Sequence, residues 1–89
     1  MDEKIAVLGA GAWGTTLADL MAGKGYRVAL WGRSSEQMER MRSKRENERL
    51  LPGLRLCSDL ELSSDLEGTV DGALYCILAV PCQFLRHVL

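Results

Sequence analysis

Short apolar runs recur along the chain and alternate with stretches that mix polar and apolar residues. Residues 5–8 (IAVL), 27–31 (RVALW) and 73–80 (ALYCILAV) are short and rich in strand formers. Runs of this kind are typical of buried strands. Residues 60–63 predict a further short strand at an edge of the sheet. The almost wholly apolar run 73–80 is expected of a parallel strand that helices cover on both faces.

The segment after the first run has helical spacing. Leu17, Leu20 and Met21 fall at i, i+3 and i+4, which places them on one face of a helix. We expect this face to pack inward. Gly23 and Gly25 follow it and predict the end of the helix.

A second helix is predicted from the spacing of Ser34 and Gln37. A serine three residues before a glutamine matches the capping box, in which each side chain bonds to the backbone of the other residue. We expect this helix to run to about residue 46. Met38 and Met41 should then face inward, while the charged residues around them form a solvated face.

Two more helices are predicted in the second half of the chain. Ser64 and Glu67 repeat the capping-box spacing before a brief helix that ends near Asp71 and Gly72. Pro81 suits the first turn of a further helix, because its missing N–H has no helical partner there. We expect that helix to continue to the last residue.

The predicted elements alternate between strand and helix from the first apolar run onward. This order predicts an α/β fold with a parallel sheet, because parallel strands need crossover connections. With right-handed crossovers, the simplest arrangement is a doubly wound sheet in the strand order 3-2-1-4. We expect residues 1–89 to form a single domain whose sheet is truncated after its fourth strand.

Three glycines follow the first predicted strand at once, in the sequence IAVLGAGAWG. Gly9 permits a tight turn, Gly11 lets the backbone approach a phosphate closely, and Gly14 lets the helix pack near the sheet. The helix N-terminus offers free N–H groups and a partial positive charge to an anion. Glycines in this strand-to-helix context predict a Rossmann-like dinucleotide-binding site. The alternative is a tight structural turn that binds no nucleotide.

The end of the second predicted strand bears on which dinucleotide is bound. NAD sites usually carry an acidic residue there, which bonds the ribose 2′-hydroxyl. This chain has Arg33 instead, followed by Ser34 and Ser35. A guanidinium beside hydroxyl groups suits a 2′-phosphate, so NADP (as NADPH) is favoured as the cofactor and NAD stays possible. The alternative for Arg33 is a solvated loop residue.

The two tryptophans are expected in different surroundings. Trp31 lies in a predicted strand and should belong to the core of the sheet. Trp13 lies inside the glycine loop, where it either walls the cofactor cleft or packs in the core. Residue type alone leaves both alternatives open.

Composition excludes several classes of protein. The 89 residues are 47% hydrophobic and 26% charged, as in ordinary globular domains. Eleven Lys and Arg against 12 Asp and Glu give a net charge of -1, so neither nucleic acid nor an anionic membrane is an expected partner. The apolar runs are too short for a signal peptide or a membrane span, which favours a cytoplasmic location. Cys57, Cys76 and Cys82 lack metal-ligand spacing, so we expect free thiols and no metal site.

Four longer stretches carry a more specific signal than the glycines alone. They are IAVLGAGAWGTTLA at residues 5–18, VALWGR at 28–33, REN followed by LPG within 45–53, and ILAVPCQFLRHVL at 77–89. Together they resemble the N-terminal part of the bacterial type of NAD(P)-dependent glycerol-3-phosphate dehydrogenase. The resemblance implies reduction of dihydroxyacetone phosphate to sn-glycerol 3-phosphate with NADPH or NADH, which supplies phospholipid synthesis.

The resemblance also implies roles for individual residues. Ala12, Trp13 and Gly14 would line the pyrophosphate and adenine side of the cofactor. Arg33 would bind the 2′-phosphate, with Ser34 next to it.

The end of the fourth predicted strand belongs to the same implied site. The resemblance places Val80, Pro81 and Cys82 there, close to the cofactor cleft. The family's catalytic lysine and its substrate-phosphate residues come from later in its chain, and no residue here matches them. We therefore expect no catalytic residue, an absent substrate domain, and a chain that is catalytically incomplete by itself.

A sheet that ends after its fourth strand would leave an apolar edge and a helix face uncovered. We therefore expect the chain to form a homo-oligomer through that edge or face. Two other functions stay open beside the dehydrogenase. One is a stand-alone nucleotide-binding or regulatory module, and the other is a structural domain that binds no nucleotide.

Overall fold

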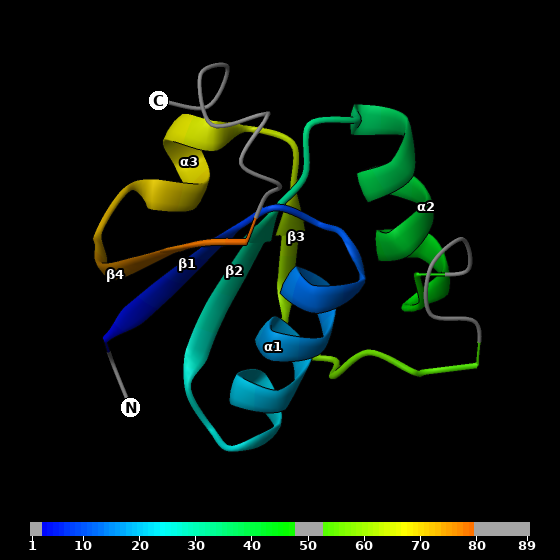
Figure 1. Ribbon diagram of the computed structural model, residues 1–89, viewed down its shortest axis with the longest axis horizontal. Helices are drawn as coiled ribbons and strands as arrows, with labels where there is room; N and C mark the ends of the chain where they lie inside the picture. Colours follow the sequence, from blue (N-terminus) through cyan, green and yellow to red (C-terminus); the bar gives the residue numbers. More distant parts are fainter. Residues whose placement is uncertain (1–2, 48–52, 80–89) are drawn as a thin grey trace.

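The structure contains a parallel sheet of four strands. The computed structural model describes residues 3–47 and 53–79. The strands are β1 (Lys4–Leu8), β2 (Arg27–Trp31), β3 (Glu61–Ser63) and β4 (Ala73–Leu78), and they pair in parallel. They lie in the order β3-β2-β1-β4 (Figure 1). The predicted α/β fold and the strand order 3-2-1-4 are confirmed.

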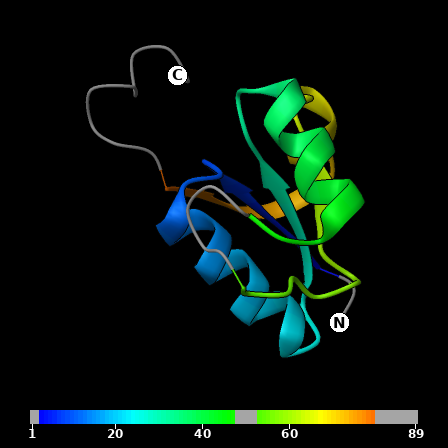
Figure 2. The same cartoon turned by 90° about the vertical axis from the view of Figure 1, so that its right-hand side faces the viewer.

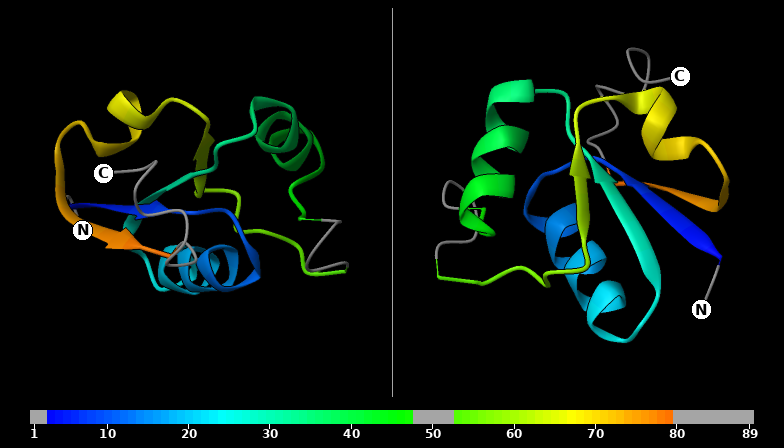
Figure 3. Two further views of the ribbon diagram at one scale, coloured as in Figure 1. Left: turned by 45° about the horizontal axis from the view of Figure 1, so that its top comes forward. Right: turned by 180° about the vertical axis from the view of Figure 1, so that it is seen from behind.

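Helices lie on both faces of this sheet. α1 (Ala12–Gly23) and α2 (Ser35–Lys44) share one apolar cluster with the strands. α3 (Leu66–Val70) packs on the other face, against a second cluster that contains Leu8 and Trp31. Figures 2 and 3 show α1 and α3 on opposite sides of the sheet. Within the described ranges, no helix is long and apolar enough to cross a membrane.

The sequence predicts α2 well. Ser34 caps its N-terminus, because the serine hydroxyl oxygen accepts a hydrogen bond from the N–H of Gln37 at 3.1 Å. Met38 and Met41 are 1% and 2% exposed, so the predicted inward face is confirmed. The helix ends slightly earlier than predicted, because Arg45 adopts a left-handed conformation with a φ of 54°.

The prediction for the inward face of α1 is wrong for Leu20, whereas Met21 packs against the core cluster. The buried residues of this helix are all small or short: Gly14, Thr15, Ala18 and Ala22. Leu20, which was expected inside, is 56% exposed, and Leu17 and Met21 are only partly buried. Small side chains on the sheet-facing side let the helix approach the strands closely, and this leaves the larger side chains at its flanks.

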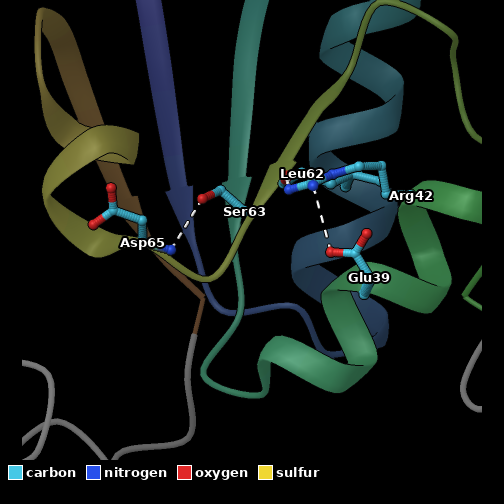
Figure 4. Close-up of polar contacts among 5 residues, drawn as sticks. All are labelled: Glu39, Arg42, Leu62, Ser63 and Asp65. Carbon is cyan, nitrogen blue, oxygen red and sulfur yellow. Dashed lines mark hydrogen bonds and ion pairs between the residues drawn. The ribbon is translucent and has the colours of Figure 1, made fainter.

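Arg42 of α2 covers the outer edge of β3. Its guanidinium donates to the carbonyl oxygen of Leu62 at 2.7 Å and pairs with the carboxylate of Glu39 at 3.4 Å (Figure 4). Just beyond β3, the backbone N–H of Asp65 donates to the hydroxyl oxygen of Ser63 at 2.9 Å. The carbonyl of Leu62 is therefore engaged by a side chain and not by another strand.

The short helix α3 begins one residue later than its capping-box spacing predicts. Its N-cap is Asp65, not Ser64, and no side chain caps the first turn. The hydroxyl of Ser63 holds the N–H of Asp65 instead, so the turn is fixed before the helix starts. The predicted end of the helix near Asp71 is confirmed.

A buried lysine holds the C-terminal end of α3. The ammonium group of Lys4 donates to the carbonyl oxygens of Gly68 and Asp71, each at 3.0 Å. Lys4 is 7% exposed although its side chain is charged. A cation at a helix C-terminus satisfies carbonyls that have no partner within the helix. The contact ties the amino end of β1 to α3.

β4 is less covered than its sequence predicts. Tyr75 is 61% exposed and Leu74 is 60% exposed, so the prediction of a strand covered on both faces is wrong for the described residues. The physical reason is that β4 is the outermost strand, with β1 as its neighbour in the sheet. The predicted end of this strand at Val80 and the helix predicted from Pro81 lie outside the described residues.

Candidate functional site

Three strands end together at the carboxyl edge of the sheet. Leu8 is level with Trp31 of β2 and with Leu78 of β4. The N–H of Gly9 donates to the carbonyl of Trp31, and the N–H of Ala79 donates to the carbonyl of Leu8, both at 2.8 Å. β2 and β3 lie on one side of β1, and β4 lies on its other side, so the strand order reverses at β1. Ligands of open α/β sheets bind at such a reversal of strand order.

The fold itself requires the first and third glycines of the loop. Gly9 has a φ of 125°, which side chains rarely allow. A Cβ on Gly14 would lie 1.9 Å from the carbonyl oxygen of Gly9 and 3.1 Å from the Cβ of Ala79. No side chain fits at this distance. α1 can therefore lie this close to the end of β1 only because residue 14 is a glycine.

Gly11 differs from the other two because the fold leaves room beside it. It is the N-cap of α1 with an ordinary φ of -75°, and a Cβ there would meet no atom within 4 Å. The first helical bond runs from the N–H of Thr15 to the carbonyl of Gly11 at 2.9 Å, so the N–H groups before Thr15 lack a helical acceptor. No side chain caps them, and no acidic residue lies in the first turn. This arrangement can accept an anion.

Trp13 is exposed at the start of the helix. Its exposed fraction is 68%, which excludes the alternative that it packs in the core. Ala12 beside it is also exposed. Both residues lie on the first turn of α1, next to N–H groups that have no helical acceptor. Trp31 is 8% exposed, as predicted for a residue of the sheet core.

Arg33 and Ser34 follow β2 at the same edge of the sheet. A Cβ on the preceding Gly32 would lie 2.4 Å from the Sδ of Met38 and 2.8 Å from the Cβ of Ala10. This close packing places Arg33 beside the glycine loop, where it is exposed. Ser34 is also exposed, although its hydroxyl oxygen caps α2. No acidic residue lies between the end of β2 and the cap of α2.

Two residues at this edge were not predicted from the sequence. Gln37 and Asn47 each donate a side-chain amide hydrogen bond to the carbonyl oxygen of Ala10, at 3.4 and 3.2 Å. Asn47 is 1% exposed, although it is polar. In the sequence, Asn47 stands out only as part of the REN stretch at residues 45–47, and its spacing does not link it to Ala10. Pro81, which was also predicted for the site, lies outside the described residues.

The described residues offer no alternative centre of metal chemistry. Within residues 3–47 and 53–79, no group of three His, Cys, Asp or Glu side chains is arranged to hold a metal ion. Cys57 and Cys76 are free thiols, as predicted, and Cys82 lies outside the described ranges.

Comparison with known proteins identifies the family. The family model for the N-terminus of NAD-dependent glycerol-3-phosphate dehydrogenase matches residues 4–89. A glycerol-3-phosphate dehydrogenase (NAD(P)+) from Solidesulfovibrio magneticus is 51% identical over 83 residues, which are 93% of this chain and 25% of that protein. The enzyme of the same name from Citrifermentans bemidjiense is 47% identical over 89 residues, which are 100% of this chain and 27% of that protein.

Solved structures agree with this match. The crystal structure of glycerol-3-phosphate dehydrogenase from Coxiella burnetii superposes with a TM-score of 0.90 at 34% identity, over 97% of this chain and 26% of that one. The enzyme from Saccharomyces cerevisiae gives 0.88 at 30% identity, over 99% of this chain and 29% of that one. The chain thus spans about a quarter of the length of its first relatives, which are 25% and 27% covered. It belongs to the NAD-dependent glycerol-3-phosphate dehydrogenase family and corresponds to the N-terminal, dinucleotide-binding region of that family.

Proposed function

We propose that this chain binds a nicotinamide dinucleotide at the carboxyl edge of its sheet, and that it prefers NADPH to NADH. The observation that carries the proposal is the open N-terminus of α1, where a Cβ on Gly11 would meet no atom within 4 Å. A pyrophosphate needs both close backbone approach and unpaired N–H donors. The relatives' name, which includes NAD(P)+, supports the same class of cofactor.

The residues of the glycine loop have different roles in cofactor binding. Gly9 and Gly14 hold α1 against the end of β1, which the contact between them supports. Gly11 leaves space for a phosphate oxygen. Ala12 and Trp13 line the pyrophosphate and adenine side of the cofactor, and their exposure on the first turn of α1 is consistent with that part.

The preference for NADPH rests on Arg33. This residue is exposed directly after β2, beside the loop, in a segment without acidic residues before the cap of α2. A guanidinium there binds a doubly charged 2′-phosphate more strongly than a neutral 2′-hydroxyl, because its hydrogen bonds to phosphate oxygens are charge-assisted. Ser34 adds a hydroxyl next to it. The resemblance alone adds Pro81 to this cleft, from the end of the fourth strand.

The family supports a proposal for the function of the whole protein. We propose that residues 1–89 serve as one cofactor-binding domain, and that the protein to which this region belongs reduces dihydroxyacetone phosphate to sn-glycerol 3-phosphate. The names of the relatives support that reaction, and this chain matches about a quarter of their length, 25% and 27% of the first two. In this proposal the described residues bind the cofactor, and the rest of the protein binds and reduces the substrate.

The proposal is tested by titrating the chain with NADPH and, separately, with NADH in a calorimeter. We expect NADPH to bind more tightly, and Arg33→Ala to weaken NADPH by about ten- to a hundredfold while NADH changes little. Arg27→Ala is the matched control, because Arg27 is an exposed arginine at the opposite end of β2. A chain that binds neither dinucleotide would refute the proposed site. If both arginine variants lose the same NADPH affinity, only the role of Arg33 is refuted, and the proposed site stands.

A further inference from the structure

Two side-chain amides converge on one carbonyl oxygen of the glycine loop. The Nδ2 of Asn47 lies 3.2 Å from the oxygen of Ala10, and the Nε2 of Gln37 lies 3.4 Å from the same oxygen. Ala10 is the residue between Gly9 and Gly11, and it is 8% exposed. Both donors come from beyond β2, so the loop after β1 is held by residues far along the chain.

Asn47 also reaches the first turn of α1. Its Nδ2 donates a second hydrogen bond to the hydroxyl oxygen of Thr15, at 3.1 Å. Asn47 and Thr15 are 1% and 0% exposed, so water does not compete for these groups. A side-chain amide nitrogen carries two hydrogens, and both are used here. Asn47 therefore bridges the loop to the helix that follows it.

The chain after α2 is shaped to deliver Asn47 to this position. Arg45 turns the backbone with its left-handed φ of 54°, and the N–H of Leu56 donates to its carbonyl at 2.7 Å. The next residue, Glu46, pairs with Arg55 in an antiparallel bridge. The turn and the bridge bring Asn47 to α1, where it bonds to Thr15.

Holding the carbonyl of Ala10 also fixes the direction of the next N–H. The peptide bond is planar and trans, so the N–H of Gly11 points opposite to the carbonyl of Ala10. With the carbonyl turned toward Asn47, that N–H points away from the buried amide. It makes no hydrogen bond with any described residue. The donor is therefore oriented in advance, before a ligand arrives.

We propose that Asn47 is a positioning residue of the dinucleotide site, which sets the backbone N–H groups of the glycine loop toward the pyrophosphate, and that Gln37 assists it. This inference rests on the proposed cofactor function. Asn47 does not touch the cofactor in this scheme. It acts through Ala10 and Thr15, which are its two acceptors. Preorganised donors bind an anion more tightly than donors that must first be ordered.

The test compares NADPH affinity among variants of the full 89-residue chain. Asn47→Asp keeps the shape of the side chain but replaces both donors with an oxygen that repels the carbonyl of Ala10. We expect its NADPH affinity to fall by at least about tenfold, and that of Gln37→Ala to fall less. Gln37→Ala also serves if Asn47→Asp does not fold.

Thr69→Val is the control for a general loss of stability. Thr69 is 2% exposed, and its hydroxyl bonds within α3 on the other face of the sheet. We expect this variant to retain NADPH affinity under conditions in which it is folded. If Thr69→Val weakens NADPH as much as Asn47→Asp does, or if Asn47→Asp and Gln37→Ala both bind like the original chain, the positioning role is overturned.

A measurement without ligand separates this inference from the proposed function. In amide NMR spectra of the free chain, we expect Asn47→Asp to shift and broaden the signals of residues 9–15 and to leave those of α3 unchanged. Unchanged signals of residues 9–15 would overturn the positioning role, whatever the titrations show. If the original chain binds no NADPH but these signals move, the hydrogen-bonded bridge stands and the proposed cofactor function is what fails.

Discussion

The position that a Cβ of Gly14 would occupy lies 1.9 Å from the carbonyl oxygen of Gly9. The obstructing atom belongs to the backbone, so it cannot rotate away as a flexible side chain would. Gly9 itself is fixed by its φ of 125° and by its hydrogen bond to Trp31. The turn after β1 and the first turn of α1 therefore form one rigid unit.

The first prediction concerns Gly14→Ala. Alanine would gain about 1 kcal/mol in helix propensity, but overpacking against a backbone atom should cost about 3 kcal/mol. We therefore expect a net loss of about 2 kcal/mol in the free energy of unfolding. Urea denaturation followed by circular dichroism measures it. Gly23→Ala is the matched control, because Gly23 ends the same helix with no atom within 4 Å of its Cβ position. A Gly14→Ala chain as stable as the original would contradict the role given to this contact.

The second prediction separates folding from binding at Gly11. Gly11→Ala should leave the free energy of unfolding nearly unchanged, because its φ of -75° suits any residue and its Cβ would meet no atom within 4 Å. The added methyl group would occupy the space assigned to a phosphate oxygen, so we expect at least about a tenfold loss of NADPH affinity. Urea denaturation and calorimetric titration of the same sample give both values. Unchanged affinity would place the pyrophosphate elsewhere.

Local sequence pattern predicted some features of this fold and not others. Apolar runs and capping residues correctly predicted the four strands and the buried Met38 and Met41, because these features depend on local pattern. The strand order was predicted from the alternation of strands and helices together with right-handed crossovers. The inward face of α1 could not be predicted by the same rule, since close packing selects alanine and glycine over Leu20. The bridge from Asn47 to Ala10 depends on the turn at Arg45, and no local signal encodes that turn.

The third prediction concerns Lys4, which begins β1 at the end of the sheet opposite the glycine loop. Lys4→Met keeps the length of the side chain but leaves the carbonyls of Gly68 and Asp71 without their donor. We expect a loss of about 1–3 kcal/mol in the free energy of unfolding, because these groups are partly buried. NADPH affinity of the folded variant should not change. A thermal unfolding curve with and without NADPH tests both statements, and a selective loss of binding would contradict the second.

The fourth prediction concerns self-association through β4. Leu74 and Tyr75 are 60% and 61% exposed on this outermost strand. We propose that two copies pair there, since an exposed apolar edge strand is a template for another strand. Sedimentation velocity at micromolar concentration should show a dimer, and Tyr75→Lys should shift it toward monomer because a charge opposes edge pairing. Leu20→Lys, on the exposed side of α1, is the control and should stay dimeric. A monomeric original chain would contradict the pairing.

The two outer strands of the described sheet, β3 and β4, present different edges. At β3, Arg42 occupies the carbonyl of Leu62, and the strand is only three residues long. β4 is six residues long, and Leu74 and Tyr75 are exposed on it. A sheet with two open ends can polymerise without limit, whereas one with a single open end pairs through a twofold axis and then has no end left to extend. We expect the guanidinium of Arg42 to oppose pairing of another strand with β3, so that assembly through the sheet would stop at a pair.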